Sequence, residues 1–152
     1  MADWSPQRLA WAAGFFDGEG SIGIYERNQG RYSRLTSDIS QRDPRPLLIF
    51  KEMFGGNIRK WDDRRGDNAV IWHWTISSRR AAIALETMLP YLILKRERAE
   101  LALAYQKLMK YEKRNYGLTQ EDLEARRIIR DEMRLLNRKG RIVSVDRLPV
   151  GG

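Results

Sequence analysis

The chain has 152 residues, with 28 Lys and Arg against 20 Asp and Glu, so its formal net charge is +8 and its length is typical of one domain. It contains no cysteine and one histidine, His73. Zinc ribbons, thiol catalysis and disulfide frameworks are therefore excluded, as are ordinary Ser/His triads unless His73 serves in one. The remaining chemistry must use carboxylates, amides and cations. With this surplus of positive charge, we expect a polyanionic partner, nucleic acid ahead of a membrane surface.

No stretch reaches the ~18 consecutive apolar residues of a membrane span, and the first residues lack the pattern of a signal peptide. We expect an intracellular protein, cytoplasmic or organellar, with no membrane partner. We also expect a single domain over residues 1–152, with a core over about 5–115, a C-terminal helix over about 119–137 and a flexible tail over 138–152.

The positive charge is unevenly distributed. Residues 1–70 carry a net charge of +1 and residues 71–152 a net charge of +7. A surface that reads bases needs donors and acceptors of both kinds, which fits the balanced first half. The basic groups at 95–98, 107–114 and 138–147 fit phosphate contacts, and they equally fit ordinary solvated helix surfaces.

The first helix is predicted by Ser5 as its N-cap and Pro6 at its first position, and the sequence DGEG at 17–20 ends it. This helix is apolar nearly all round. Its small residues recur every three or four positions and make one flat face, formed by Ala10, Ala13, Gly14 and Gly18. That face fits either a close neighbour within the chain or a symmetric contact between two helices.

Two hairpins and further helices are predicted after it. Residues 21–27 and 34–40 alternate between apolar and polar, Asp43 and Pro44 open a second helix that Gly55 and Gly56 stop, and residues 57–62 and 69–77 form a second hairpin. Helices follow near 78–89, 95–113 and 119–137, the last capped by Thr119. The fold class is thus α+β: α-β-β-α-β-β-α with a four-stranded antiparallel sheet, helices on one face and additional C-terminal helices. An open polar sheet face can be merely solvated.

Residues 12–21, AAGFFDGEGS, resemble the motif of the LAGLIDADG homing endonucleases, and the similarity extends over about 9–99, including QRD at 41–43 and LPYLILKR at 89–96. Ala12 replaces the motif's first Leu, and Glu19 replaces its final Asp but retains the carboxylate. The resemblance is to the small, single-motif members. It implies a saddle-shaped sheet and a homodimer that makes a staggered double-strand break, with short 3′ overhangs, in a long near-palindromic DNA site during intron homing.

The resemblance also implies roles for individual residues. Glu19 and the carbonyl of Gly18 would bind Mg²⁺ or another divalent cation such as Mn²⁺, and a two-fold axis along the first helix would bring two copies of Glu19 together. Catalysis would further use Gln41 to order water and Arg45 and Lys95 to offset phosphate charge, although both cations also fit a plain helix surface. The implied dimer interface comprises Ala10, Ala13, Gly14 and Asp17, and we favour a structural capping role for Asp17.

If the open sheet face binds double-stranded DNA, alternation indicates its base-reading residues. They are Gly23, Tyr25, Arg27, Arg34, Thr36, Asp38, Ser40, Arg59, Trp61, His73 and Thr75. The second hairpin is less clear, because this parity directs Trp61 to the DNA and Lys60 to the core.

Two alternatives remain from the sequence. One is a nucleic-acid-binding protein that uses the same scaffold without cleaving, as an intron RNA maturase or a DNA-binding regulator. The other is a protein-interaction domain that docks a partner through its last helices.

Overall fold

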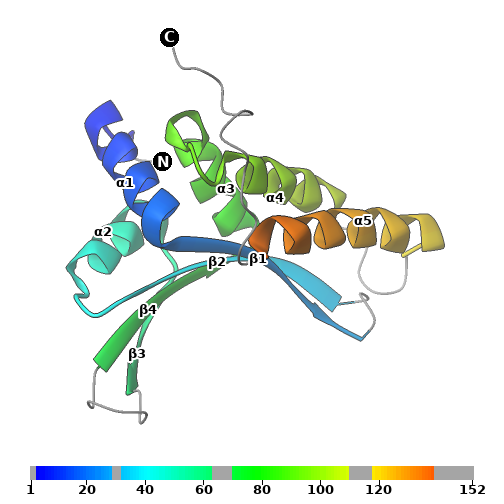
Figure 1. The fold of residues 1–152 in the computed structure, drawn as a ribbon, viewed down its shortest axis with the longest axis horizontal. Helices are drawn as coiled ribbons and strands as arrows, with labels where there is room; N and C mark the ends of the chain where they lie inside the picture. Colours follow the sequence, from blue (N-terminus) through cyan, green and yellow to red (C-terminus); the bar gives the residue numbers. More distant parts are fainter. Residues whose placement is uncertain (1–2, 29–31, 63–69, 110–117, 139–152) are drawn as a thin grey trace.

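The structure is a computed structural model that describes residues 3–28, 32–62, 70–109 and 118–138. Its elements are α1 (Pro6–Glu19), β1 (Gly20–Arg27), β2 (Tyr32–Gln41), α2 (Arg45–Phe54), β3 (Asn57–Asp62), β4 (Val70–Ser77), α3 (Ser78–Met88), the 3-10 helix η1 (Leu89–Tyr91), α4 (Arg96–Leu108) and α5 (Gln120–Asn137). The helices cover one face of the sheet and the other face is open (Figure 1). This confirms the predicted α+β architecture.

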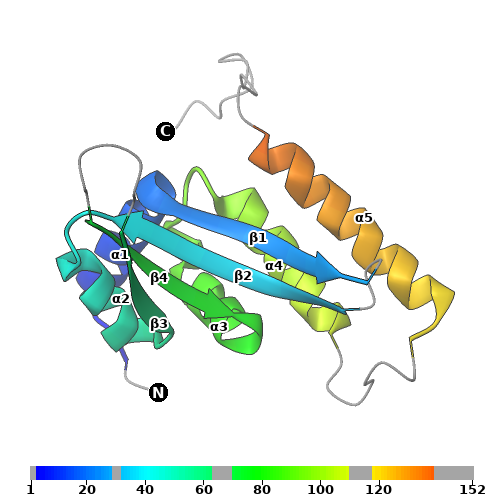
Figure 2. The ribbon, with the colours of Figure 1, turned by 90° about the horizontal axis from the view of Figure 1, so that it is seen from below.

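The sheet is antiparallel and its strands lie in the order β1-β2-β4-β3, so the two hairpins meet where β2 pairs with β4. Seen from below, no helix crosses the open face, and α5 runs along the edge formed by β1 (Figure 2). Leu35 and Ile39 on β2 and Trp74 on β4 are fully buried toward the helices. The alternation read from the sequence is therefore the alternation between core and open face.

Helix α1 begins and ends as predicted. The Ser5 hydroxyl accepts a hydrogen bond from the backbone N–H of Arg8 at 3.2 Å, which satisfies one of the free donors of the first turn. At the other end Gly20 has extended backbone and its N–H donates to the Phe16 carbonyl. A Cβ at Gly20 would overlap the buried Phe16 ring, so the direct passage from α1 into β1 requires a glycine there.

The second hairpin is attached to α2 through Trp74. Its indole Nε1 donates to the Gly55 carbonyl at 2.8 Å, and its ring centroid lies 5.2 Å from that of Phe50. Gly55 and Gly56 have φ of +79° and +87°, in the left-handed region that favours glycine. The predicted glycine stop of α2 is thus also the acceptor that orients a core tryptophan.

One helix boundary was predicted wrongly. α4 ends at Leu108, whereas the sequence predicts a helix to 113; its buried positions end at Tyr105. Residues 110–114, the predicted turn at 63–68 and nearly all of the expected tail lie outside the described residues. Within the described part, no helix is long and apolar enough to cross a bilayer.

Candidate nucleic-acid interface and catalytic site

The strand pairings decide which side chains share the open face. Gly23 pairs with Thr36 and Tyr25 with Arg34 on the first hairpin, and Ser40 pairs with His73 in the centre of the sheet. His73 pairs in turn with Arg59, and Trp61 pairs with Ile71 on the second hairpin. All residues expected to read bases therefore lie on one face: Gly23, Tyr25, Arg27, Arg34, Thr36, Asp38, Ser40, Arg59, Trp61, His73 and Thr75.

Contacts between these side chains hold several of them in place. Tyr25 accepts a hydrogen bond from Arg27 Nε at 2.6 Å, and the Arg27 and Arg34 guanidinium carbons lie 5.5 and 5.4 Å from its ring centroid. Such cation–π contacts restrict long flexible side chains. Tyr25 thus positions two arginines, the side chain best suited to bidentate contact with guanine.

The second hairpin carries a similar group. His73 Nδ1 is 2.7 Å from the Ser40 hydroxyl, and the Trp61 and His73 rings are 5.3 Å apart. Trp61 is exposed on the open face, and its neighbour Lys60 pairs with Trp72 on the opposite face but is itself exposed. The predicted alternation of this strand is therefore correct. Trp61 lies on the open face, and Lys60 lies on the opposite face without being enclosed by the core.

Five further residues lie on the open face and were not among the predicted base-reading residues: Ser21, Tyr32, Asn57, Ile71 and Ser77. Ser21 donates to the Asp38 carboxylate at 2.8 Å, and Tyr32 is opposite Arg27 at the far end of the first hairpin. Extending the alternation of β2 by one step, from Arg34 to Tyr32, would have found the tyrosine.

Glu19 is an exposed carboxylate at the junction between α1 and the sheet. Gly20 pairs with Ile39, so Glu19 lies near the end of β2, where the half-buried Gln41 is located. The Lys95 ammonium donates to the backbone carbonyl of Asp17. Burial and the neighbouring Arg98 lower the pKa of Lys95, and the Asp17 and Glu19 carboxylates oppose this effect. The structure therefore brings Glu19 and Lys95 together.

Asp17 is buried and acts as a cap within its own chain. Its carboxylate accepts from the backbone N–H of Ile93 at 2.7 Å and of Lys95 at 3.0 Å, which ties α1 to the segment before α4. Ala13 is also buried. Ala13 and Asp17, which the resemblance assigns to the dimer interface, are thus both covered within their own chain. Ala10 and Gly14 are exposed on α1.

Arg45 is in a different environment. Its guanidinium binds the Asp43 carboxylate, with the closest atoms 2.6 Å apart, and both groups are exposed. Hydrogen bonds from the Arg45 side chain and backbone lower the pKa of Asp43 to about 2. No described contact joins Arg45 to Glu19, so an approaching phosphate would have to compete with Asp43 for this guanidinium.

The described residues include no group of three His, Asp or Glu side chains that could hold a metal ion. Glu19 offers one accessible carboxylate, and the Gly18 carbonyl lies in the last turn of α1, where helix carbonyls have no partner within the helix. Such oxygen donors suit Mg²⁺, which binds through one or two carboxylates and takes its other ligands from water and phosphate. The residues present therefore fit a divalent cation only if further ligands come from outside this chain.

No protein-family model and no curated protein matches the chain. Several solved structures do match it. The homing endonuclease I-CvuI, in complex with its target in the presence of Ca, is 26% identical with a TM-score of 0.67, over 90% of this chain and 87% of that chain. The archaeal intron-encoded homing endonuclease I-Vdi141I, complexed with DNA, is 15% identical with a TM-score of 0.70, over 88% and 86% of the two chains.

The LAGLIDADG homing endonuclease I-GzeII, in complex with its DNA target, is 19% identical with a TM-score of 0.64. The match covers 90% of this chain but 47% of that one. The shared architecture is that of DNA-binding endonucleases, and it places the motif at residues 12–21 at the end of α1, directly before the open sheet. The chain thus has the fold of the LAGLIDADG homing endonucleases, and it carries a sequence similar to their motif at residues 12–21.

Proposed function

We propose that this protein is a site-specific, Mg²⁺-dependent endonuclease of the intron-homing type, which acts as a homodimer and cuts both strands of a long near-palindromic DNA site. The observation that carries the proposal is the position of Glu19. It is the exposed carboxylate that follows the exposed side of α1, borders the open sheet face and is close to the Lys95 ammonium. The open sheet face, which would read the DNA bases, therefore ends beside a carboxylate that could hold the metal for cleavage.

The surface of α1 supports a homodimer. A Cβ added at Gly14 or Gly18 would meet no atom within 4 Å, so a second helix could approach this side closely. The neighbouring Ile93 and Leu94 are 82% and 70% exposed, although both are apolar. A second copy would cover them and bring the two Glu19 carboxylates together. The chain lengths are compatible with a homodimer. This chain spans 87% of I-CvuI but about half of I-GzeII, so two copies would be needed to match the length of the longer endonuclease.

The chemistry requires the groups at the junction of α1 and the sheet. Glu19 and the Gly18 carbonyl would hold Mg²⁺, which when bound polarises the scissile phosphate and activates water. Gln41 can donate to and accept from an ordered water, because its amide has both kinds of group. Lys95 supplies a positive charge that offsets the charge developing on the phosphate. Arg45 adds a second cation when a phosphate displaces Asp43.

The test is Glu19→Gln. This change removes the negative charge that binds metal but retains the size of the side chain, so cleavage should be lost while DNA binding persists. Selection of cleaved sequences from a randomised near-palindromic library, with Mg²⁺, supplies the substrate. Loss of binding together with cleavage would contradict the division between Glu19 and the sheet, and an active variant would refute the proposed role of Glu19.

Dimerisation has a separate test. Gly14→Leu should leave the fold intact, because the side chain enters open space, and should convert the dimer to a monomer on size-exclusion chromatography. An unchanged dimer would place the interface elsewhere.

A further inference from the structure

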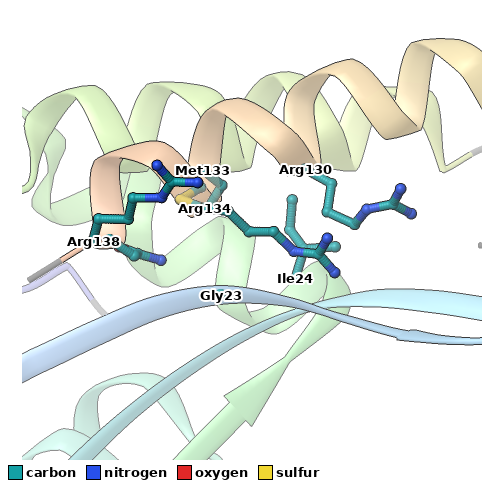
Figure 3. A pocket seen from close by; sticks show the side chains of 7 residues that line it. Gly23, Ile24, Arg130, Met133, Arg134 and Arg138 are labelled. Atoms are coloured by element: carbon teal, nitrogen blue, oxygen red, sulfur yellow. The ribbon is translucent and has the colours of Figure 1, made fainter.

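A depression of about 280 Å³ lies between α5 and the edge strand β1 (Figure 3). Gly23, Ile24 and Met133 line it together with Arg130, Arg134 and Arg138, which project from the same side of α5. β1 is one of the two edge strands of the sheet, so these three arginines lie outside the face that would read bases.

Two contacts anchor α5 at this edge. Asn137 Nδ2 donates to the Ile22 carbonyl on β1 at 2.8 Å. Arg130 pairs with Glu26 at 2.7 Å, and its side chain is only 12% exposed. Because Arg130 is half-buried and its charge is neutralised by Glu26, its role is to attach α5 to β1.

Arg134 and Arg138 differ from Arg130. The Arg134 side chain is 65% exposed, and its distances to Glu26 and Asp131 are 3.5 and 4.0 Å, at the limit of an ion pair. Exposed pairs of this kind contribute little to stability. Arg138 follows one helical turn later and is also exposed. The two guanidinium groups are therefore available to an anion from outside the chain.

The width of the sheet indicates which anion. Three spacings of ~4.8 Å separate the outer strands by about 14 Å, whereas the major groove of DNA is about 12 Å wide. A four-stranded sheet seated in that groove must bring its edges against the sugar-phosphate backbone. The edge formed by β1 is the one that α5 flanks (Figure 2).

We infer that Arg134 and Arg138 form a phosphate clamp, which binds the DNA backbone beside β1 and contributes affinity without base specificity. This inference rests on the proposed function, because it assumes that the open sheet face binds duplex DNA. Phosphate contacts position a protein on DNA and carry no sequence information directly.

The experiment compares salt dependence of binding for the full chain and its variants. The double variant Arg134→Gln/Arg138→Gln removes the clamp, and Arg134→Lys/Arg138→Lys retains its charge. Lys51→Gln/Arg80→Gln removes the same charge from exposed positions on α2 and α3 in the helix layer. Affinity for a random-sequence duplex, and for a cleaved site where one has been selected, is measured from about 50 to 200 mM salt without divalent cation.

Each phosphate contact contributes ~0.9 to the slope of log affinity against log salt, so losing two contacts per chain lowers the slope of a dimer by roughly 3.6. The fall in affinity across that salt range should then be about 10²-fold smaller than for the wild type. The lysine variant should retain most of the slope, the control all of it, and the set of cleaved sequences should be unchanged.

An unchanged slope in the glutamine variant, or an equal loss in the control, would overturn the clamp. A changed base preference would also overturn it, since the arginines would then read bases. A wild-type protein with no salt dependence would instead refute the DNA-binding function itself, so the two failures are distinguishable.

Discussion

Asp17→Asn is the most direct test of how α1 is joined to the segment before α4. The Asp17 carboxylate accepts two backbone hydrogen bonds, from Ile93 at 2.7 Å and Lys95 at 3.0 Å, in a buried position. Asparagine has nearly the same shape but only one acceptor oxygen. Its amide N–H₂ would therefore face one of the two backbone N–H groups, and two donors cannot satisfy each other.

The expected loss follows from these two bonds. A hydrogen bond to a charged group contributes ~1.5–3 kcal/mol, and a buried donor left without a partner costs a similar amount. Because the remaining acceptor keeps part of the interaction, we expect the free energy of unfolding to fall by about 2–4 kcal/mol. For a chain of this size that corresponds to a Tm lower by about 5–15 °C.

Urea and thermal unfolding would measure the change, with all samples at one protein concentration because the proposed homodimer would make stability depend on concentration. Glu86→Gln, an exposed carboxylate on α3, is the matched control and should stay within about 0.5 kcal/mol of the wild type. If Asp17→Asn is equally mild, then the carboxylate does not hold the 93–95 segment and the capping role is refuted.

Three further predictions concern packing, a buried hydroxyl and pH. Gly20→Ala should lower the free energy of unfolding by about 1–3 kcal/mol, because its methyl group would overlap the Phe16 ring. Gly23→Ala is the control, since a methyl group there would have Thr36 Oγ1 as its nearest contact, at 3.7 Å. Equal urea midpoints for the two variants would refute the packing argument. Ser33→Ala should cost about 1–3 kcal/mol by leaving the buried Tyr105 hydroxyl without its partner, and adding Tyr105→Phe should recover part of that loss in the same assay. Burial lowers the pKa of Lys95 from 10.5, so cleavage that needs its ammonium should fall as pH rises through a value below 10.5. In single-turnover rates against pH, Lys95→Arg should shift that fall to higher pH, and an identical profile would exclude Lys95 as its source.

Much of the fold follows from local patterns in the sequence. Ser5 and Thr119 cap their helices as predicted, because a cap depends on residues three positions apart. The alternation of Leu35 and Ile39 with polar neighbours identified both faces of β2, since successive strand residues point to opposite sides. These signals also assigned the open face, and the motif at residues 12–21 identified Glu19 as the candidate metal ligand.

The sequence did not predict what depends on contacts between distant residues. Asp17 binds backbone groups 76 and 78 positions later, and Asn137 binds a carbonyl 115 positions earlier. Ala13 has the same spacing as the exposed small residues of α1 but is buried, because the rest of the chain folds over that side.

Length, composition and charge by themselves predicted a single basic domain and excluded thiol and zinc-cysteine chemistry, and the local patterns added the predicted elements and the candidate metal ligand. The tertiary structure decided the rest. It placed Lys95 beside Glu19, arranged the strands in the order β1-β2-β4-β3 and set the arginines of α5 along the outer edge of the sheet. The physical reason is that composition and periodicity specify how each segment is buried, whereas only the packing of the whole chain specifies which segments meet.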